Sequence, residues 1–504
     1  MSRIAERLAA ATPEEKRELL AQLLRKRAGA PRSHPLSFAQ ERLWFLDRLT
    51  RGSAAYNIPT AVRLSGRLDL GAFERSINEI RRRHEALRTT FSVRDEDPVQ
   101  LVGPAEPLPV PLTDLGHLPE AEREAEARRL VTEEGQTPFS LEEGPLLRVR
   151  VLRLADEEHV VMVTMHHIVS DGWSMDVLLR ELIVLYQAFS AGQPSPLPEL
   201  PIQYGDFARR QRQALGGGAA EAQVAYWKRQ LEGIPPVLRL PTDRPRPEAP
   251  SFRGAFASRG LPAELTEPLK ALSRRHGATL FITLLTAFKV LLHFYSKQDD
   301  IVVGTPSAGR EGVETEGLIG FFINTLILRT RIQGDPGFGE LLGEVRRVVL
   351  EAQAHRDVPF EKVVEAAQPQ RSVGHMPLFQ VTFAFTNAPR RPPELPGLRM
   401  YEFGALSGTS KVDLELVTVE TAQNFIASLQ YNTDLFNAAT ADRMLAHFET
   451  LLAHILARPE IRLGELTGAL AEAERRQKLA QEELLTQARL EKFKKTRRRG
   501  VSGV

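Results

Sequence analysis

The chain has 504 residues, enough for two large α/β lobes or for three domains of ordinary size. Hydrophobic residues make up 42% of the chain and charged residues 26%, a composition that excludes a mostly disordered protein. The net charge is only +2, whereas nucleic-acid-binding proteins normally have a clear basic excess, so we expect no nucleic-acid partner. Because the chain has no cysteine, disulfides, thiolate metal sites and a cysteine nucleophile are excluded.

The two ends of the chain are expected to be polar. Residues 1–32 are predicted to be a helical leader and linker, because Thr12-Pro13-Glu14-Glu15 is typical of a helix start and Ala28 to Pro35 is interrupted by proline. The alternative for this leader is a docking segment for another protein. Residues 471–504 are predicted to be a charged helical linker or tail, and its basic end leaves a nucleic-acid-binding tail as the weaker alternative.

Residues 33–215 are expected to form a first lobe. Its predicted helices are Leu70–Arg83, Ala121–Glu134 and Ser174–Ala191, and its predicted strands are Leu87–Val93, Leu146–Leu154 and His159–His167. The stretch from Pro98 to Pro119 is rich in proline and is predicted to be irregular.

Residues 216–470 are expected to form a second lobe. Its predicted helices are one after Pro262, one at 279–296, Phe338–Ala354 and Ala439–Leu456, and its predicted strands are Ile301–Thr305, Leu326–Arg331, Phe379–Phe385, Asp413–Glu420 and Ile426–Tyr431. Strands that alternate with helices indicate α/β layers in both lobes.

No membrane partner is expected. The first ten residues, MSRIAERLAA, are charged and lack the apolar run of a signal peptide. The most apolar window, Thr279–Tyr295, is too short for a membrane span and contains Lys289 and His293. We therefore predict a buried core helix there and a cytoplasmic location for the protein.

The strongest chemical signal is MHHIVSDGWS at 165–174, which follows the apolar run HVVMVTM. This run predicts a strand buried on both faces, and adjacent strand residues point to opposite faces. His166 and His167 therefore cannot both face one cavity, so one is expected to be functional and the other structural. A histidine at a strand end is suited to proton transfer near neutral pH, although a lone histidine is more often a satisfied core residue. A metal site is not predicted, because HExxH and a Cys/His cluster are both absent.

HHIVSDGWS resembles the HHxxxDG motif of nonribosomal peptide synthetase condensation domains, a motif that related acyltransferases and epimerisation domains share. Other stretches resemble the same family's motifs, in its order and spacing, from about residue 33 to 470. They are SFAQERLWFL at 37–46, RHEALRTTF at 83–91, YGDFA at 204–208, IGFFINT at 319–325 and HRDVPFE at 355–361. A seventh motif, RDxSRNPLF, is degraded to QRSVGHMPLF at 370–379.

The resemblance implies an α/β fold of two chloramphenicol-acetyltransferase-like lobes, arranged as a V-shaped pseudo-dimer with a central channel. It implies an acyltransferase of secondary-metabolite biosynthesis, for example of an antibiotic or a siderophore. This enzyme would form an amide bond between a carrier-bound acyl or peptidyl thioester and the amine of a carrier-bound aminoacyl acceptor. The expected partners are donor and acceptor peptidyl carrier proteins and neighbouring synthetase domains. No cofactor or metal is expected on the chain itself, since both substrates arrive on 4′-phosphopantetheine arms.

The resemblance also implies roles for single residues. His167 would act as general base, or position the amine and stabilise the tetrahedral intermediate. Gly172 would let the backbone and the substrate approach closely, and its N–H would bind the oxyanion. His166 would face away and hold the strand end, and Asp171 would pair with Arg310 of the second lobe.

Three more residues are expected as possible channel residues. They are Trp173, Ser174 and Asn387, the last at the end of the stretch QVTFAFTN.

Other functions of the same fold remain open at this stage. They are an epimerisation domain, a non-catalytic family member that recruits a tailoring enzyme, and a stand-alone acyltransferase with soluble substrates. Within condensation domains, the motifs look most like the type that joins two L-residues, and a starter type that loads a fatty acyl chain is the alternative. The start at Met1 suits the first domain of a synthetase, and we expect the native protein to continue beyond residue 504.

Overall fold

The computed structural model describes most of the chain. The described residues are 32–479, apart from 51, 215–217, 250, 311, 369–375, 387–394, 396, 405–407 and 422. The predicted leader helix, the tail after residue 479 and the proposed channel residue Asn387 lie outside the described residues.

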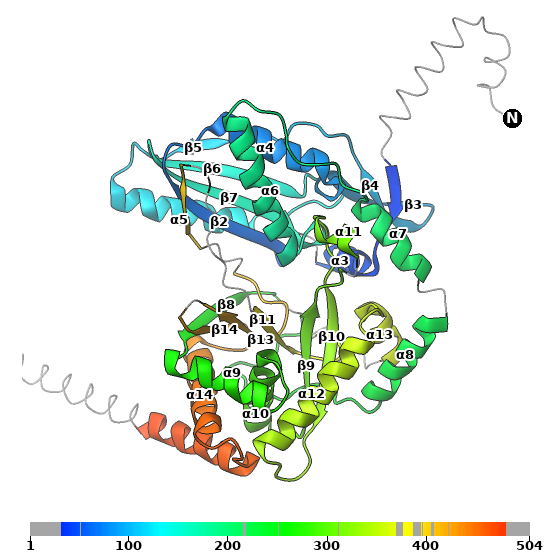
Figure 1. Ribbon diagram of the computed structural model, residues 1–504, viewed down its shortest axis with the longest axis vertical. Helices are drawn as coiled ribbons and strands as arrows, with labels where there is room; N and C mark the ends of the chain where they lie inside the picture. Colours follow the sequence, from blue (N-terminus) through cyan, green and yellow to red (C-terminus); the bar gives the residue numbers. More distant parts are fainter. Residues whose placement is uncertain are drawn as a thin grey trace, which may run out of the picture.

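Two lobes lie one above the other along the long axis of the molecule, each built on one large sheet (Figure 1). The N-terminal lobe has a five-stranded sheet in the order β12-β2-β7-β6-β5, and the C-terminal lobe has a six-stranded sheet in the order β10-β9-β11-β13-β14-β8. A third sheet, β1-β4-β3, lies beside the first. The two α/β lobes predicted from the sequence are confirmed.

The large sheet of the N-terminal lobe is covered on both faces. Its strands include β2 (Asn57–Ser65), β5 (Leu112–Asp114), β6 (Leu147–Ala155) and β7 (Glu158–His166), and its helices are α4 (Leu70–Arg83), α5 (Glu120–Gln136) and α6 (Gly172–Ser190). In β7, Val161 and Val163 pack with α4 and α6, whereas Val160 and Met162 pack with α5. The apolar run HVVMVTM is therefore buried on both faces, as the sequence predicts.

Two segments that were expected to be irregular are strands, and they form a small sheet together with the predicted strand at Leu87–Val93. Its strands are β1 (Arg32–Pro35), β3 (Thr89–Arg94) and β4 (Asp97–Val102). β1 lies in the predicted linker, and β4 together with β5 lies in the stretch predicted to be irregular. The prediction is wrong there because β1 pairs with residues far along the chain, Arg32 opposite Val102, and a local pattern does not show such a pairing.

The C-terminal lobe contains the largest hydrophobic core. Its strands are β8 (Gly254–Gly260), β9 (Asp300–Ser307), β10 (Asn324–Arg331), β11 (Val381–Thr386), β13 (Leu414–Glu420) and β14 (Phe425–Asn432). Its helices are α8 (Gly218–Leu231), α9 (Thr266–Arg275), α10 (Leu280–Ser296), α12 (Phe338–Ala354), α13 (Phe360–Ala367) and α14 (Ala438–Ala457).

The predicted core helix, α10, is buried along most of its length in this lobe. Among the described residues, no single helix is long and apolar enough to cross a membrane. The helical stretches 263–275 and 280–296 meet those limits only as a pair, and the pair is bent by 101°. Residues 463–479 are helical across the expected start of the tail at residue 471, and Leu466 and Leu470 join the core.

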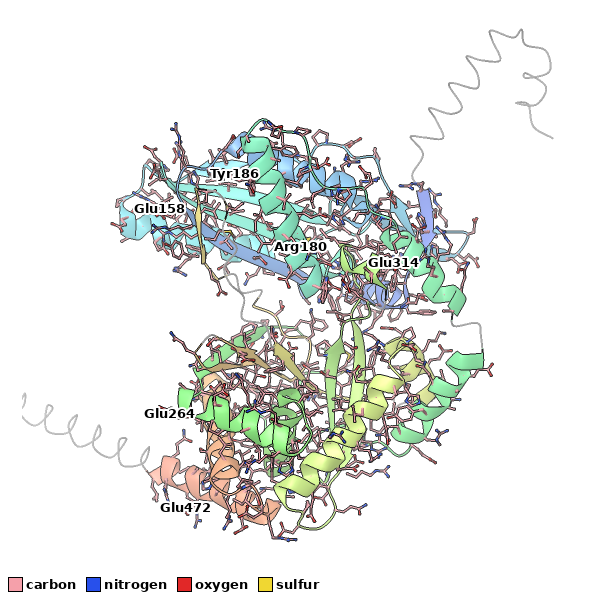
Figure 2. All side chains as sticks on the ribbon, viewed as in Figure 1. Glu158, Arg180, Tyr186, Glu264, Glu314 and Glu472 are labelled. Atoms are coloured by element: carbon pink, nitrogen blue, oxygen red, sulfur yellow. The ribbon has the colours of Figure 1, made fainter. Side chains whose placement is uncertain are left out.

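The C-terminal half of the chain also reaches into the N-terminal lobe. β12 (Arg399–Glu402) pairs with residues 62–65 of β2 and so extends the N-terminal sheet. α11 (Val313–Glu316), which follows β9, lies beside α3 (Phe38–Leu49) and α7 (Tyr204–Ala214), as Figure 1 shows. Figure 2 likewise shows Glu314 at the N-terminal lobe, whereas Glu264 and Glu472 lie in the other lobe.

One charged side chain lies inside the C-terminal core. Lys289 of α10 is 0% exposed, and its Nζ donates hydrogen bonds to the carbonyl oxygens of Ile301 (3.3 Å) and Leu328 (2.6 Å). Burial lowers the pKa of Lys289 to about 7, because the interior disfavours the charged ammonium. The unfolded chain therefore binds one proton more than the folded chain between about pH 7 and pH 10.5, and stability rises with pH across this window.

Lys289→Met should stabilise the protein at pH 7, because it removes the cost of keeping or discharging a buried ammonium. Each pKa unit corresponds to about 1.4 kcal/mol, so we expect a gain of a few kcal/mol, reduced by two lost hydrogen bonds. The gain should shrink toward pH 10. Urea denaturation of the wild type and the variant at pH 7 and pH 10 measures the gain, and the exposed Lys228→Met is the control. A gain in stability that is equal at the two pH values would contradict this account.

Candidate functional site

The HHIVSDG stretch joins the end of β7 to the start of α6. β7 ends at His166, a 3₁₀ turn covers His167–Val169, and α6 begins at Gly172 with Asp171 as its N-cap. The predicted strand was therefore one residue too long, and the predicted helix began two residues too late. The His167 N–H still donates to the carbonyl of Tyr56 beside β7 (2.8 Å), and the turn then begins with the Ser170 N–H bonded to the His167 carbonyl (3.3 Å). Asp171 caps the helix by accepting from the N–H of Ser174 (2.8 Å).

His166 is enclosed by the N-terminal lobe. It is 3% exposed, and its ring lies 6.4 Å from the ring of Tyr56 and 6.1 Å from that of Phe139. Its Nδ1 accepts from the N–H of Ile168 (3.1 Å), which fixes the start of the turn. Burial lowers the pKa of His166 to about 3, so this ring is neutral at pH 7.

His167 is partly exposed and differs from its neighbour in its surroundings. Its Nδ1 lies 2.8 Å from the carbonyl oxygen of Ser170, which only accepts, so Nδ1 carries the hydrogen and Nε2 carries the free lone pair. The Phe321 ring packs edge-on against it at 4.8 Å. Burial, followed by the nearby Lys411 ammonium, holds the pKa of His167 well below its usual value. The imidazole is therefore neutral at pH 7 and able to accept a proton at Nε2.

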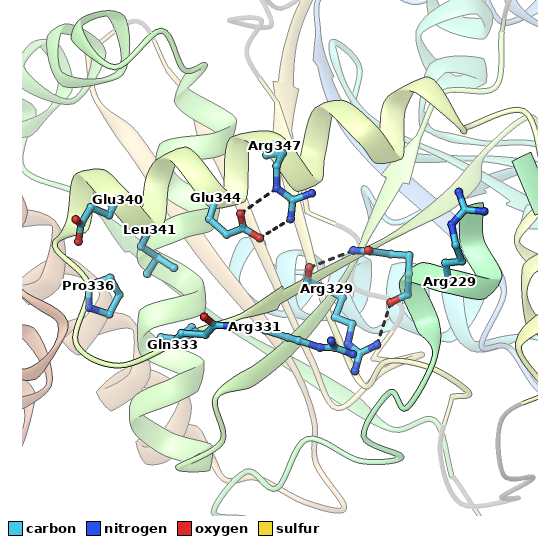
Figure 3. A pocket seen from close by; sticks show the side chains of 11 residues that line it. Arg229, Arg329, Arg331, Gln333, Pro336, Glu340, Leu341, Glu344 and Arg347 are labelled. Atoms are coloured by element: carbon cyan, nitrogen blue, oxygen red, sulfur yellow. Dashed lines mark hydrogen bonds and ion pairs between the residues drawn. The ribbon is translucent and has the colours of Figure 1, made fainter. Parts of the chain in front are cut away.

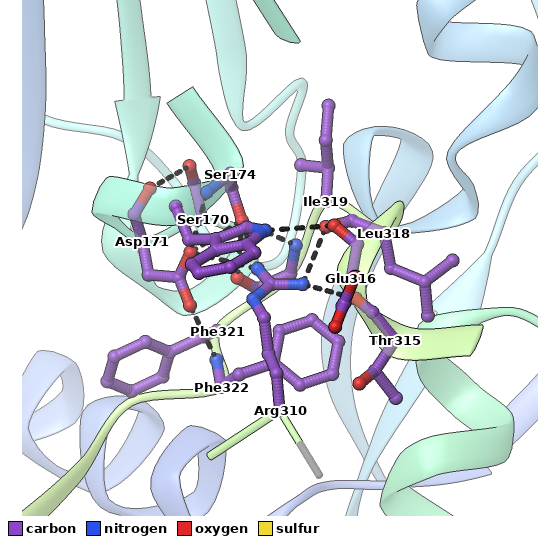
Figure 4. Close-up of polar contacts among 12 residues, drawn as sticks. Ser170, Asp171, Ser174, Arg310, Thr315, Glu316, Leu318, Ile319, Phe321 and Phe322 are labelled. Carbon is purple, nitrogen blue, oxygen red and sulfur yellow. Dashed lines mark hydrogen bonds and ion pairs between the residues drawn. The ribbon is translucent and has the colours of Figure 1, made fainter. Parts of the chain in front are cut away.

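The Asp171 carboxylate accepts four hydrogen bonds (Figure 4). Its Oδ1 accepts from the Ser174 N–H (2.8 Å), the Ser174 hydroxyl (2.7 Å) and Arg310 Nη2 (3.0 Å), and its Oδ2 accepts from the Phe322 N–H (3.0 Å). The side chains of Asp171 and Arg310 are each 2% exposed. The expected Asp171–Arg310 contact is present. Ser174, expected as a possible channel residue, is fully buried in this junction instead, because its hydroxyl also accepts from the Gly320 N–H (3.0 Å).

Residues 315–322, here called the crossing segment, come from the C-terminal half and are held by the N-terminal lobe. The Trp173 indole of the N-terminal lobe donates to the carbonyl oxygen of Glu316 (2.9 Å). Arg310, which precedes the segment in the same half of the chain, shapes it by donating from Nη1 to the carbonyl oxygens of Thr315 (2.6 Å) and Leu318 (2.8 Å). Trp173, another expected channel residue, is 45% exposed and covers the outside of this contact.

Two further side chains hold the crossing segment, and no local sequence pattern indicates this contact. His84 Nδ1 accepts from the Ile319 N–H (3.2 Å), while its Nε2 faces Glu181 (3.0 Å). The Tyr204 hydroxyl donates to the Phe321 carbonyl (2.6 Å). A methyl group at Gly320 would lie 2.1 Å from the Tyr204 ring, so only glycine permits this approach. Both residues belong to motifs noted above, RHEALRTTF and YGDFA, but their partners are far away in the chain.

Gly172 lies at the open end of α6. A methyl group added at its Cα would meet no atom within 4 Å, so protein packing does not demand glycine here. The space in front of this residue is therefore available to a substrate, next to the positive end of the α6 helix dipole.

An interlobe pocket of about 400 Å³ lies against the crossing segment, which contributes Thr315, Phe321 and Phe322 to its wall. It is lined by residues that include Phe207, Arg210, Phe321, Asn324, Arg356 and Glu361. Phe321 joins this pocket to the HHIVSDG stretch, since its ring also contacts His167. Asn324 shapes the floor by bonding the carbonyls of Arg356 (2.8 Å) and Val358 (2.9 Å).

A second pocket, of about 440 Å³, lies on the outside of the C-terminal lobe and is rich in arginine (Figure 3). Arg329 binds the Asp300 carboxylate (2.7 Å) and the carbonyls of Gln230 and Glu232, so it joins β10 to the end of α8. Arg347 binds Glu344 (2.6 Å). These arginines already have partners, which favours a structural role. Within the described ranges, no three His, Asp or Glu residues are placed to hold a metal ion.

Comparison with known proteins places this geometry in a family. The family described as "Condensation domain" matches residues 31–479. A linear gramicidin synthase of Brevibacillus parabrevis is 51% identical over 427 residues, which are 84% of this chain and 6% of that protein. A phosphinothricin tripeptide synthetase of Streptomyces viridochromogenes is 42% identical over 434 residues, which are 86% of this chain and 40% of that protein. The chain thus spans less than half the length of these relatives.

Solved structures share both lobes. The X-domain from teicoplanin biosynthesis matches with a TM-score of 0.78 at 30% identity and covers 85% of this chain and 96% of that one. The complex of the X-domain and OxyB matches similarly, at 29% identity, covering 86% of this chain and 96% of that one. A four-domain nonribosomal peptide synthetase matches with a TM-score of 0.78 at 25% identity, over 86% of this chain and 34% of that one.

Asp171→Ala and Arg310→Ala should each lower the free energy of unfolding by about 3–5 kcal/mol, because each leaves a buried charge without its partner. The double variant should lose clearly less than the sum, since both changes remove the same interaction. Urea denaturation of the four proteins measures this coupling. The exposed pair Arg347 and Glu344 is the control and should couple by less than about 1 kcal/mol. Additive losses at Asp171 and Arg310 would show that the contact carries no coupling.

Proposed function

Since the chain belongs to the condensation-domain family of nonribosomal peptide synthetases, we propose that it forms an amide bond between two carrier-bound substrates. The donor is an acyl or peptidyl thioester, and the acceptor is the amine of an aminoacyl thioester. The observation that carries the proposal is a neutral His167 with a free Nε2 lone pair. Its ring contacts Phe321 of the interlobe pocket, and the unblocked Gly172 follows it in the same motif.

The reaction needs one proton to move. As the amine nitrogen bonds to the thioester carbonyl carbon, the nitrogen becomes positively charged and the carbonyl oxygen negatively charged. His167 Nε2 orients the amine through a hydrogen bond and accepts its proton. The C–S bond then breaks, and the same proton passes to the leaving thiolate. Because the pKa of His167 is held low, the imidazolium does not retain this proton.

Gly172 contributes the binding site for the developing oxyanion. Its N–H is at the first turn of α6, where N–H groups lack partners within the helix and favour negative charge. Stabilising an oxyanion in this way contributes most when the donor is fixed before the reaction. Asp171 fixes it as the N-cap of the same turn.

The partners follow from the substrates. Donor and acceptor peptidyl carrier proteins would bring the two thioesters on 4′-phosphopantetheine arms, and neighbouring synthetase domains would supply those carriers. The chain itself would hold no cofactor. Much of the rate would come from placing two tethered reactants next to each other, so that their reaction resembles an intramolecular one. The gramicidin synthase that this chain resembles is many times longer, which supports a role as one domain among others.

The subtype that joins two L-residues is the preferred proposal, and a starter type that loads a fatty acyl chain is the alternative. Incubating the chain with an aminoacyl acceptor carrier and a panel of donor carriers distinguishes them. Mass spectrometry of the acceptor should find peptidyl product from an L-aminoacyl donor. Fatty acyl product alone would favour the starter type.

A second candidate function is recruitment of a tailoring enzyme, as in the X-domain structure solved in complex with OxyB. The intact HHIVSDG stretch and the unblocked Gly172 favour catalysis over recruitment. A chain that bound a tailoring enzyme but formed no amide with any carrier pair would support recruitment.

His167→Ala should abolish amide formation, because the ring Nε2 is assigned to the reaction. It should leave the fold unchanged, because the ring is partly exposed and its one side-chain hydrogen bond stays within the same turn. Product on the acceptor carrier, measured by mass spectrometry, should fall at least ~100-fold. The exposed histidine variant His117→Ala should react at the wild-type rate. Turnover of His167→Ala close to that of the wild type would contradict the assigned role.

Gly172→Ala should fold normally, since its methyl group meets only open space. If the thioester carbonyl occupies that space, the methyl group displaces it from the N–H, and the turnover number should fall by about 100-fold or more. The melting temperature of the variant tests whether it folds normally, and its single-turnover rate tests the loss of oxyanion binding. An unchanged rate would remove Gly172 from the oxyanion site.

A further inference from the structure

Lys411 is a cation of the C-terminal half that lies against the N-terminal lobe at the catalytic motif. Its Nζ lies 5.1 Å from the ring centre of Tyr56. Tyr56 contacts both histidines, because its carbonyl accepts from the His167 N–H (2.8 Å) and its ring lies 6.4 Å from that of His166. A positive charge from one lobe is therefore presented to the reaction centre of the other.

The backbone around Lys411 is fixed on both sides. The Ser410 N–H donates to the carbonyl of Phe252 (2.7 Å), and its hydroxyl donates to the carbonyl of Val412 (2.7 Å). On the other side, the Asp413 N–H donates to the carbonyl of Gln380 (2.9 Å), and Arg246 binds the Asp413 carboxylate (2.9 Å). These hydrogen bonds on both sides hold the backbone of Lys411 in place, and they therefore limit where its ammonium can lie.

We propose that Lys411 is a positioning residue of the condensation reaction, whose charge keeps the acceptor amine and His167 unprotonated in the site. The inference rests on the proposed function, because it concerns the amine that attacks the thioester. It assigns to Lys411 no bond making or breaking and no proton transfer.

The physical reason is the state of the amine. An α-amino group has a pKa of about 7.7–8.0 in water, so more than about four-fifths of it is the unreactive ammonium at pH 7. A fixed positive charge in a partly buried site disfavours a second positive charge there, which lowers the pKa of the amine and raises the reactive fraction. The same field acts on the imidazole of His167.

The charged groups around Lys411 are one carboxylate that opposes its field and one guanidinium that adds to it. Burial lowers the pKa of Lys411 to about 8, with Glu415 of β13 opposing the shift and Arg42 of α3 adding to it, so the ammonium predominates at pH 7. Burial raises the pKa of Glu415, and the Lys411 ammonium opposes that shift. Arg42 lies 3.8 Å from Glu361 and is therefore partly neutralised. Tyr56, His166 and His167 are neutral.

The test is the pH dependence of amide formation by Lys411→Met and Lys411→Arg in the full chain, with loaded donor and acceptor carriers. The acidic limb of kcat, which reports groups in the enzyme–substrate complex, should move up by about one pH unit in Lys411→Met, which is a loss of up to about tenfold on the acidic side. The two rates should converge near pH 9, where the wild-type lysine has lost its own charge. Lys411→Arg keeps a charge there and should keep the acidic limb in place, as should the exposed control Lys228→Met.

Two outcomes would overturn the inference. One is an acidic limb that does not move in Lys411→Met, and the other is a loss of the same factor at every pH, which a purely structural role would give. A wild-type chain that forms no amide with any carrier pair contradicts the proposed function instead.

A second measurement does not depend on carriers. NMR titration of the His167 ring, identified by its absence from His167→Ala, should give a higher pKa in Lys411→Met than in the wild type. An unchanged His167 pKa in a folded Lys411→Met variant would also overturn the inference.

Discussion

The site depends on one buried carboxylate. Asp171 accepts hydrogen bonds from three parts of the chain: the first turn of α6 through Ser174, the loop after β9 through Arg310, and the crossing segment through Phe322. Leaving any of these donors without a partner would cost free energy, since the side chains of Asp171 and Arg310 are both buried. One carboxylate therefore fixes two things at once. It fixes the start of the helix that carries Gly172, and it fixes the position of the crossing segment from the C-terminal half.

This coupling explains how a site made from two lobes holds its geometry. The crossing segment places Phe321 against His167, and the Tyr204 hydroxyl and His84 hold the same segment from the N-terminal side. In the turn after β7, the Ser170 carbonyl accepts from His167 Nδ1, and this hydrogen bond fixes the tautomer that leaves the lone pair on Nε2. The imidazole is thus oriented by its own lobe and enclosed by the other, which keeps it neutral. Lys411 adds a charge from the second lobe that acts in the same direction.

Much of the fold could be predicted from local patterns, because long amphipathic or wholly apolar segments specify their own structure; α4 and α12 begin and end where the sequence places them. β2 escaped prediction because Pro59 interrupts it. The structure tolerates this proline where only β7 pairs with β2, since β12 pairs with residues 62–65 alone.

In the site, the motif pointed to His167 and to the Asp171–Arg310 contact. The burial of Ser174 and the presence of Lys411 depend on distant segments that no local pattern joins.

Hydrogen exchange at the crossing segment tests most directly whether the Asp171 carboxylate holds the two lobes together at the site. The Phe322 and Gly320 amides should be strongly protected in the wild type, because each donates to a buried acceptor of the junction. In Asp171→Asn the Phe322 amide should exchange at least ~10-fold faster, while the amides that pair β6 with β7 keep their protection. Equal protection of the crossing segment in both proteins would contradict the account.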